Sequence, residues 1–326
     1  MENSKVTNWG ILGCGKIAHK FAEDLQKVSN AKIAGVASRS FDKAKEFGIK
    51  FNSHNFYGSY EELVHNESID VIYIATPHVF HKQHTLLCLH NKKAVLCEKP
   101  FGMNKEEVEE MIACAKANKV FLMEALWTYF LPHYQYVIDI IKTKKLGDVK
   151  SIEADFGFAA NFDPNSRLFD KKLGGGSLLD IGIYPVFAAL TILGYPDHIS
   201  AQATFSDTGI DESCSIQFSY NNGMSAKLYS TITEQTATKA VIQFDKGVVT
   251  LNSRFHEPTD ILISTKDEDS LKTFDYTTNG YFYEAEHVQQ MLNQNKLESN
   301  IMSFSTSISL IELLDKIRKI IGLNYN

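Results

Sequence analysis

Residues 8–18 read Asn-Trp-Gly-Ile-Leu-Gly-Cys-Gly-Lys-Ile-Ala, so that a short apolar run leads into Gly13-x-Gly15-x-x-Ala18. This pattern is typical of a strand that turns tightly into a helix at a dinucleotide-binding site. Gly13 would allow the turn, Gly15 would let the backbone approach a pyrophosphate, and Ala18 would let the helix pack on the strand. Taken alone, the glycine pair also suits ordinary packing between a strand and a helix.

The end of the second apolar run bears on cofactor choice. Residues 32–37 lead into a Ser-Arg-Ser sequence, at a place where NAD-specific sites usually carry an acid that binds the ribose 2′-hydroxyl. Ser38, Arg39 and Lys43 instead offer a hydroxyl and two cations to a phosphate dianion. This predicts a preference for NADP, with NAD as the alternative cofactor. The other interpretation is a solvated basic helix start, because acidic residues are interleaved with lysines there.

The composition is that of a globular protein whose main partners are small molecules. Of 326 residues, 44% are hydrophobic and 22% charged, and the net charge of −6 argues against nucleic acid. Residues 1–7 lack the apolar core of a signal peptide, and no uninterrupted apolar stretch is long enough to span a bilayer. The five cysteines include no C-x-x-C pair, which argues against disulfides and structural zinc. We therefore expect a reduced, cytoplasmic protein with no membrane or nucleic-acid partner.

The order of predicted elements divides the chain into two domains. Up to residue 124, β-branched runs alternate with helical segments, which predicts a doubly wound α/β (Rossmann) domain with a parallel sheet. Residues 125–326 predict an α+β domain whose mostly antiparallel sheet has helices on one face and an open second face. An open face predicts self-association, as a homodimer or a dimer of dimers.

Several elements of these two domains can be placed from their periodicity. The strands expected in the first domain are 9–12, 32–37, 71–75, 94–97 and 120–123. Asn104 has the position of a helix N-cap. In the second domain we expect helices at 134–145 and 176–193 around a strand at 149–158 and a polar loop at 161–173, then strands at 199–205, 213–220, 224–231, 240–244, 248–252 and 260–264. Asn221-Asn222-Gly223 is a hairpin signal.

A first group of polar residues follows the third predicted strand. Thr76, Pro77 and His78 stand at its end, and His81 and His84 follow at intervals of three. The histidines resemble a metal site, but only two of them can share a helix face and no carboxylate or cysteine lies close in sequence, so we expect no metal. His78 is placed to line a nicotinamide crevice, whereas His84 is expected on a solvated helix face.

A second group is Glu98-Lys99-Pro100, at the end of the fourth predicted strand. Pro100 biases Lys99 towards an extended conformation and makes the chain leave the sheet, which directs the lysine into the crevice. A cation there can bind a substrate oxygen, stabilise a developing alkoxide or assist a neighbouring acid–base group. The alternative is a surface ion pair between Glu98 and Lys99.

A third group combines the glycines at 174–176 with Asp180 and Tyr184. Three glycines let the backbone pack closely or move before a helix, and residues four apart share a helix face. A carboxylate beside a phenol makes an acid–base pair, and a phenol with an ordinary pKa of about 10 needs assistance at neutral pH that Lys99 could supply. The alternative is a helix-capping aspartate and a packing tyrosine.

In this order and spacing, the three groups resemble the Gfo/Idh/MocA family of NAD(P)-dependent oxidoreductases. The sequences that match are Gly13-Cys14-Gly15-Lys16-Ile17-Ala18, Ala75-Thr76-Pro77 with His81, Glu98-Lys99-Pro100, and Asp180 followed by Tyr184. Tyrosine at 184, the triple glycine and Met123-Glu124-Ala125-Leu126-Trp127-Thr128 are closer to the branch of dimeric dihydrodiol dehydrogenases and NADP-dependent xylose dehydrogenases. The likeness runs nearly end to end and includes Tyr283-Glu284-Ala285.

The resemblance implies a role for each matching residue. Lys99 and Tyr184 would be catalytic with Asp180 as a positioning carboxylate, and Trp127 and Phe156 would line the substrate pocket with Asp180 and Tyr184. The residues assigned to the cofactor are Gly13, Gly15, Lys16, Ile17, Ala18, Ser38, Arg39, Lys43, Thr76, Pro77, His78, His81, Glu98, Lys99 and Trp127. The branch usually has arginine after Trp-Thr, where this chain has Tyr129, so the substrate contact differs there.

Together these observations predict an NADP-dependent oxidoreductase acting on a sugar or cyclic diol. It would transfer a hydride between nicotinamide C4 and a secondary carbinol or carbonyl carbon, with Tyr184 as acid/base assisted by Lys99. A non-catalytic NAD(P)-binding sensor or partner protein with the same fold is the alternative, because function resides in the site and not in the fold. Loss of Lys99 or Tyr184 would favour the sensor, and both residues are present.

Overall fold

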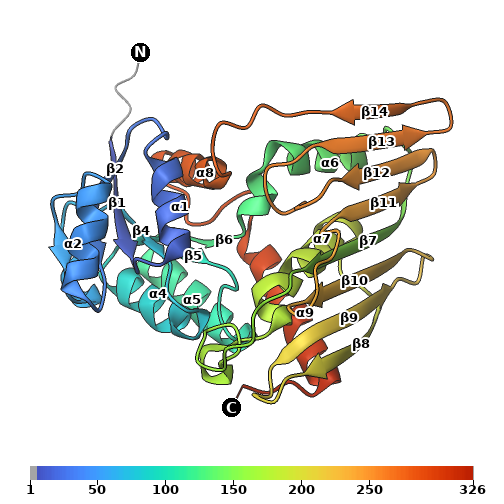
Figure 1. Cartoon of the computed structure of the whole chain (residues 1–326). Helices are drawn as coiled ribbons and strands as arrows, with labels where there is room; N and C mark the ends of the chain where they lie inside the picture. Colours follow the sequence, from blue (N-terminus) through green and yellow to red (C-terminus); the bar gives the residue numbers. More distant parts are fainter. Residues whose placement is uncertain (1–5, 326) are drawn as a thin grey trace. The chain divides into compact units, whose positions relative to one another are not determined.

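In a computed structural model of the chain, which describes residues 6–325, six strands form a sheet in the order β3-β2-β1-β4-β5-β6 with every pair parallel (Figure 1). The order reverses between β1 and β4, where open α/β sheets bind their ligands. The predicted Rossmann sheet is confirmed. Its strands are β1 (Thr7–Leu12), β2 (Ala31–Ala37), β3 (Phe56–Tyr57), β4 (Val71–Ile74), β5 (Ala94–Glu98) and β6 (Leu122–Ala125).

Two strands of this sheet differ from the prediction. β3 was not predicted, because two residues are too few to show a periodic pattern. β6 runs two residues later in the sequence than the strand predicted at 120–123. The apolar residues around it extend beyond 123, so their pattern alone does not fix where the strand begins and ends. Both differences lie away from the reversal between β1 and β4.

The helices that cover the sheet begin at side-chain caps that the sequence supplies. Ser40, Ser59 and Asn104 each accept a hydrogen bond from a backbone N–H three residues later, which satisfies a donor of the first turn. The predicted cap at Asn104 is therefore confirmed. The helical elements are α1 (Lys16–Leu25), α2 (Phe41–Lys50), α3 (Tyr60–Val64), η1 (His78–Phe80), α4 (His81–His90), α5 (Lys105–Asn118) and η2 (Trp127–Phe130).

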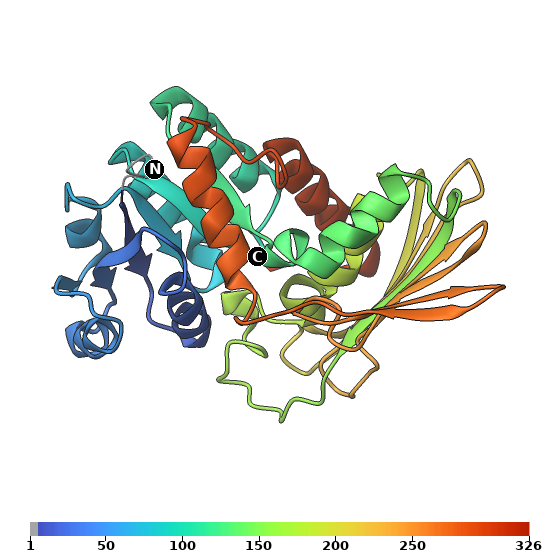
Figure 2. The same ribbon diagram turned by 90° about the horizontal axis from the view of Figure 1, so that it is seen from above.

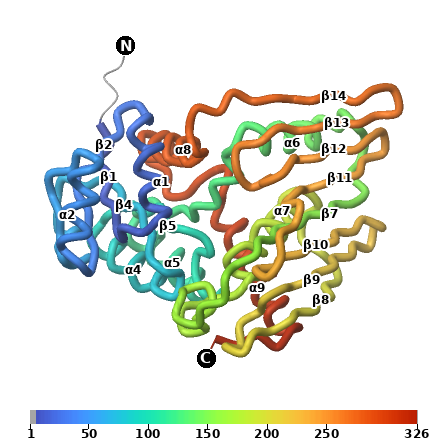
Figure 3. The backbone as a smooth tube through the Cα atoms, in the orientation of Figure 1, coloured from blue at the N-terminus to red at the C-terminus, as the bar shows by residue number. Residues whose placement is uncertain are grey.

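A segment from the far end of the chain completes this unit. By its contacts the chain divides into one unit of Met1–Phe130 with Thr277–Ile308 and another of Leu131–Tyr276 with Ser309–Asn326. α8 (Tyr281–Asn293) packs beside α1, as the backbone trace shows (Figure 3). The predicted division into 1–124 and 125–326 did not assign residues 277–308 to the first unit. A local sequence pattern can predict a helix, but it does not show on which part of the chain the helix packs.

One buried carboxylate ties α8 to α1. The oxygens of Asp24 accept hydrogen bonds from the backbone N–H groups of Asn279 at 2.9 Å, Tyr281 at 2.8 Å and Phe282 at 3.2 Å, and from the Asn279 side-chain amide at 3.0 Å. Asp24 is completely buried. It therefore caps the N-terminus of α8, where Gly280 has no side chain to do so.

The second unit is built on an eight-stranded sheet in the order β14-β13-β12-β11-β7-β10-β9-β8. Only β7 and β10 pair in parallel, so the predicted mostly antiparallel sheet is confirmed. The Asn221-Asn222-Gly223 turn joins β9 to β10 as expected. The strands are β7 (Val149–Gly157), β8 (His198–Phe205), β9 (Asp211–Ser219), β10 (Ser225–Thr231), β11 (Ala240–Phe244), β12 (Gly247–Leu251), β13 (Ile261–Thr265) and the unpredicted β14 (Asp269–Lys272).

Helices lie on one face of this sheet. α6 (Pro132–Lys142) and α7 (Ile183–Leu193) are both on that side (Figure 2), and α9 (Phe304–Ile321) passes from the first unit into the second. The stretch Lys171–Leu193 is long and apolar enough to cross a membrane by length and composition, but 83% of its 18-residue apolar window is buried. A core helix of a folded domain has the same properties.

The opposite face of the sheet carries charged and polar side chains among apolar ones. Glu153, Asp155, Gln217, Lys227 and Tyr229 lie along it, and Lys227 forms an ion pair with Glu153 at 3.1 Å. The predicted self-association rests on a half-apolar open face, and the side chains along this face are of mixed character. A homodimer or dimer of dimers stays a prediction.

The Asp24 cap leads to a stability prediction. Asp24→Ala should lower the free energy of unfolding by about 2–4 kcal/mol, because it leaves buried N–H donors without their acceptor. Urea unfolding measures the difference. Glu23→Ala is the matched control, since Glu23 is exposed and its carboxylate forms a surface ion pair with Lys50 at 3.5 Å. Equal stability of the two variants would contradict this account of α8.

Candidate active site

The glycine turn after β1 fits a dinucleotide phosphate. Gly13 has φ +98°, and a Cβ there would lie 2.9 Å from the Ala75 carbonyl oxygen, so only glycine is tolerated. A Cβ at Gly15 would meet that oxygen at an ordinary 4.0 Å, so packing within the chain does not require glycine at 15. Gly15 is also the N-cap of α1 and offers the first-turn N–H groups no side chain. A phosphate over the helix N-terminus accounts for both features.

Two exposed cations lie at the carboxyl ends of β1 and β2. Burial raises the pKa of the Cys14 thiol to about 11, and the nearby Lys43 ammonium opposes that rise. Arg39 likewise opposes the effect of burial, which raises the pKa of Tyr60. The Ser38 hydroxyl accepts a hydrogen bond from the Ser40 backbone at 3.3 Å. This arrangement places two positive charges around the turn that follows β2, where a ribose phosphate would need them.

The histidines that follow β4 are buried. His81 pairs with the carbonyl oxygens of Pro100 through Nδ1 and of Thr76 through Nε2, both at 2.8 Å. Burial lowers its pKa to about 4, so the ring is neutral and donates to one of them at a time. His84 contacts the Thr76 hydroxyl at 2.9 Å, and the prediction that it lies on a solvated face is wrong. His78 is also buried.

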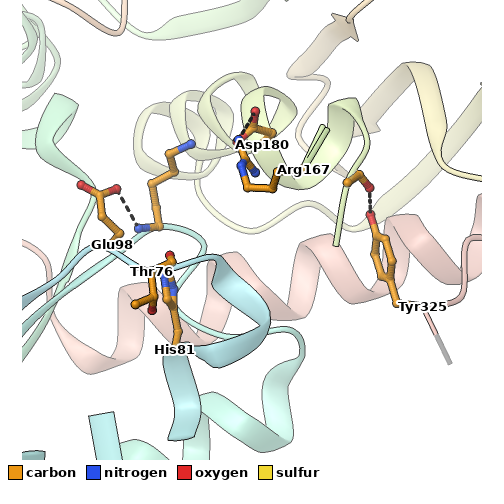
Figure 4. A network of polar contacts seen from close by, with 8 residues as sticks. Thr76, His81, Glu98, Arg167, Asp180 and Tyr325 are labelled. Carbon is orange, nitrogen blue, oxygen red and sulfur yellow. Dashed lines mark hydrogen bonds and ion pairs between the residues drawn. The ribbon is translucent and has the colours of Figure 1, made fainter. Parts of the chain in front are cut away.

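These contacts hold the ends of β4 and β5 together. His81 joins the turn after β4 to the turn after β5, which is a structural role beside the predicted cofactor role. Figure 4 shows His81 beside Thr76. Within the described residues, no group of three or more histidine, cysteine, aspartate or glutamate side chains could hold a metal ion.

Glu98 is not the exposed half of a surface ion pair. It is buried, and its carboxylate accepts a hydrogen bond from the Tyr73 hydroxyl. It also accepts one from the Lys99 backbone N–H at 3.3 Å (Figure 4). Lys99 is the first residue beyond β5. The alternative interpretation of this motif as a surface pair is therefore wrong, and Glu98 supports the backbone that carries Lys99.

Two further buried carboxyl groups, those of Glu124 and Glu284, lie near Glu98. Glu124 on β6 accepts a hydrogen bond from the Phe101 N–H at 3.1 Å, and burial raises its pKa to about 7. Burial, and then the nearby Glu98 and Asp24, raise the pKa of Glu284 well above its ordinary value. Burial therefore favours the uncharged form of Glu284 over its carboxylate. Sequence reasoning could not assign these roles, because both residues look like ordinary members of a strand and a helix.

In the second unit, Asp180 and Tyr184 lie at the entrance to α7. Residues Leu178–Gly182 form a π-helical turn, η4, and the α-helix begins at Ile183. π-turns are rare and occur often at functional sites. The Arg167 guanidinium donates from Nη2 to both oxygens of Asp180 at 3.0 Å (Figure 4). Arg167 was not predicted, since its only sign in the sequence is a single arginine within the polar loop.

A second buried aspartate holds the start of that turn. Asp211 accepts hydrogen bonds from the Ser177 hydroxyl at 2.8 Å and the Leu178 N–H at 2.7 Å. Gly176 has φ +121°, and a Cβ there would lie 2.1 Å from an Asp211 oxygen, which explains the third glycine. Burial raises the pKa of Asp211 to about 7.

Tyr184 lies in a cluster of rings. The Phe156 ring on β7 and the His256 ring stack with centroids 4.1 Å apart, and His256 lies 4.8 Å from the Tyr184 ring. The Glu257 carboxylate is 3.6 Å from His256 Nε2. The alternation of inward and outward side chains along a strand can predict the side of the sheet on which Phe156 lies. His256 lies in a loop, and nothing in the sequence marks it. In the first unit, Trp127 stacks on Tyr281 with centroids 4.3 Å apart.

Comparison with known proteins assigns the family. Residues 7–126 match the model described as an oxidoreductase family with an NAD-binding Rossmann fold, and residues 134–250 match the GFO/IDH/MocA C-terminal domain. The chain belongs to the GFO/IDH/MocA family. It is an oxidoreductase with an NAD-binding Rossmann domain, and the resemblance inferred from the motifs is confirmed.

Members of this family with known names cover nearly the whole chain. A trans-1,2-dihydrobenzene-1,2-diol dehydrogenase from Xenopus tropicalis is 38% identical over 329 residues, with 98% of this chain and 99% of that protein aligned. The human protein of that name is 36% identical, with 97% of each chain aligned. A Caulobacter crescentus aldose-aldose oxidoreductase shares the fold with a TM-score of 0.89 at 21% identity, covering 97% of each chain. A 3-ketoreductase from Actinomadura kijaniata, solved with NADP and TDP-benzene, has a TM-score of 0.86 at 23% identity, covering 96% of this chain and 97% of that one.

Asp211 gives the second unit a pH-dependent stability. Its folded-state pKa of about 7 lies above the ordinary 3.8, so the folded form keeps a proton that the unfolded form releases between these pH values. The free energy of unfolding should therefore fall as pH rises through that window. Asp211→Asn removes this proton, so from pH 5 to pH 8 its stability should improve relative to wild type.

Thermal and urea unfolding at several pH values measure this difference. Asp207→Asn, an exposed aspartate preceding the same strand, is the control and should follow wild type. A constant difference between Asp211→Asn and wild type at all pH values would show that Asp211 is ionised in the folded protein.

Proposed function

We propose that this chain is an NADP-dependent dehydrogenase or reductase acting on a secondary alcohol or carbonyl of a sugar or cyclic diol. The observation that carries the proposal is identity of 34–38% over nearly the full length to proteins named trans-1,2-dihydrobenzene-1,2-diol dehydrogenase. The presence of Lys99, Asp180 and Tyr184 supports turnover over a role as a non-catalytic sensor. A cytoplasmic location stays a prediction.

The first unit would bind the cofactor. Bound there, a nicotinamide dinucleotide accepts or supplies a hydride at ring carbon C4. The N-terminus of α1 behind Gly13 and Gly15 would bind the pyrophosphate, and Arg39 with Lys43 would bind the 2′-phosphate. The other residues proposed for this site are Lys16, Ile17, Ala18, Ser38, Thr76, Pro77, His78, His81, Glu98, Lys99 and Trp127.

The second unit would supply the acid–base group. The Tyr184 hydroxyl would give its proton to a carbonyl oxygen in reduction and take the carbinol proton in oxidation. Lys99 would stabilise the phenolate that this transfer leaves. Asp180 would position the substrate, and Phe156 and Trp127 would form apolar walls of its pocket.

Cofactor preference tests the first part of the proposal. NADP should bind at least tenfold more tightly than NAD, equivalent to about 1.4 kcal/mol, because its phosphate gains charge-assisted hydrogen bonds. Fluorescence titration of both cofactors measures the ratio. Arg39→Ala should narrow it, whereas Lys50→Ala, at the far end of α2, should not. Equal affinity of wild type for NADP and NAD would rule out the 2′-phosphate site.

Substitution of Tyr184 and Lys99 tests the chemistry. Tyr184→Phe should lower kcat by roughly 10² to 10⁴ with NADP affinity nearly unchanged, because the hydroxyl acts on substrate and not on cofactor. Lys99→Met should lower kcat by at least the same factor. It should also move the pH profile of turnover to higher pH, since the cation that stabilises the phenolate is lost. NADPH absorbance on a panel of aldoses, oxo-sugars and cyclic diols measures both.

A partly exposed tyrosine of the same unit provides the control. Tyr195→Phe removes a hydroxyl that contacts Glu312 at 2.9 Å and should turn over like wild type. If Tyr184→Phe kept most of its turnover, the proton would have to come from His78 or water. Inactivity of the wild type across the whole panel would favour the sensor.

A further inference from the structure

The Arg167–Asp180 pair is a poor candidate for a purely structural contact. The Arg167 side chain is 40% exposed and that of Asp180 18% exposed. Ion pairs that are this accessible to water contribute little to folding stability. Arg167 Nη2 nevertheless donates to both carboxylate oxygens of Asp180, each at 3.0 Å. Stability alone therefore gives little reason for this bidentate contact, which lies within reach of solvent.

The backbone around the triple glycine holds Arg167 in place. The N–H groups of Gly175 and Gly176 donate to the carbonyl oxygens of Asp170 at 3.0 Å and Leu168 at 2.9 Å. A Cβ at Gly175 would lie 2.5 Å from the Leu168 carbonyl oxygen and 2.8 Å from that of Arg167. Any larger residue at 175 would therefore push away the segment that carries Arg167. The loop segment that carries Arg167 and the glycines at 175 and 176 are therefore packed together as one rigid segment.

Tyr325 also contacts this glycine segment. The Tyr325 hydroxyl donates to the Gly175 carbonyl oxygen at 2.8 Å (Figure 4), and the Arg318 guanidinium lies 5.5 Å from the Tyr325 ring centroid. Gly175 is thus held through its N–H by Asp170 of the same loop and through its carbonyl by Tyr325, 150 residues away in sequence. The loop position that presents Arg167 is consequently fixed on both sides.

The chemistry of the pair suits one functional group. A guanidinium has five N–H donors, and Asp180 takes those of Nη2, so Nη1 and Nε can serve another acceptor. A hydroxyl group donates one hydrogen bond and accepts others, so a carboxylate and a guanidinium side by side match both of its capacities. Asp180 stands four residues before Tyr184, the residue proposed to act on the reacting hydroxyl. A second hydroxyl on the neighbouring carbon would meet Arg167 and Asp180.

We propose that Arg167 is a substrate-binding residue that, with Asp180, binds the hydroxyl adjacent to the reacting carbinol and makes the enzyme selective for vicinal diols. The inference rests on the proposed function and adds to it a determinant of substrate choice. It assigns to the polar loop the recognition of the second hydroxyl, and to Tyr184 the proton transfer at the first.

Two matched alcohols separate recognition from catalysis. Wild type should oxidise trans-1,2-cyclohexanediol with NADP at least about 30-fold more efficiently than cyclohexanol, in kcat/KM. Arg167→Met should lose roughly 10- to 100-fold in kcat/KM on the diol, mainly through KM, and change by less than about threefold on cyclohexanol. Arg167→Lys should recover part of the diol preference, because it restores the charge without the fork of donors.

Two further variants exclude trivial effects. Lys172→Met, an exposed cation of the same loop, should keep the wild-type ratio. Gly175→Ala should reduce the diol preference as Arg167→Met does, because it displaces the segment that carries Arg167. Thermal unfolding of Arg167→Met should match wild type, and calorimetric titration of the diol into the NADP complex should show the same loss of affinity as KM.

The outcomes distinguish this inference from the function on which it rests. If wild type oxidises no alcohol with NADP or NAD, the proposed function and the inference fail together. If wild type oxidises both alcohols and Arg167→Met leaves their ratio unchanged, or lowers both rates equally, the proposed function stands and the role of Arg167 in diol recognition is overturned.

Discussion

The approach of the Ala75 carbonyl oxygen to Gly13 is the constraint on which the first unit depends. It lies at the reversal of strand order between β1 and β4, where a Cβ would be only 2.9 Å from that oxygen. Because Gly13 must be glycine there, β1 can end in a turn that directs the N-terminus of α1 at the crevice. The turn after β4, held through His81, and the end of β5, held through Glu98, are built around the same edge.

The second unit uses the same device for a different purpose. Gly175 and Gly176 let a loop backbone and the Asp211 carboxylate come closer than any side chain would permit. The result is a π-helical turn with its carboxylate facing an arginine. In both units, therefore, glycines mark the places where a polar backbone or side chain approaches the site, and neither set is explained by flexibility alone.

The limits of sequence reasoning follow from the range of each interaction. β1, β2, β4 and β5 were predicted because buried parallel strands leave continuous apolar runs. Asn104 was predicted because a cap and its helix are adjacent in sequence. Arg167, Asp211 and Asp24 were not, since the partners of the last two lie 33 to 258 residues away and Arg167 reaches across an irregular loop. His84 was misplaced because a polar residue on a short helix gives no sign of the Thr76 hydroxyl that it contacts inside the unit.

The return of Thr277–Ile308 to the first unit has a consequence for how such enzymes can be recombined. The chain passes between the units at residues 130/131, 276/277 and 308/309. A fragment that stops at the end of the Rossmann sheet would lack α8, and Asp24 would be left as a carboxylate with none of the four donors that it now serves. Each unit is therefore assembled from two separate segments of the chain, and exchange of one unit between relatives requires grafting at internal junctions and not a single crossover.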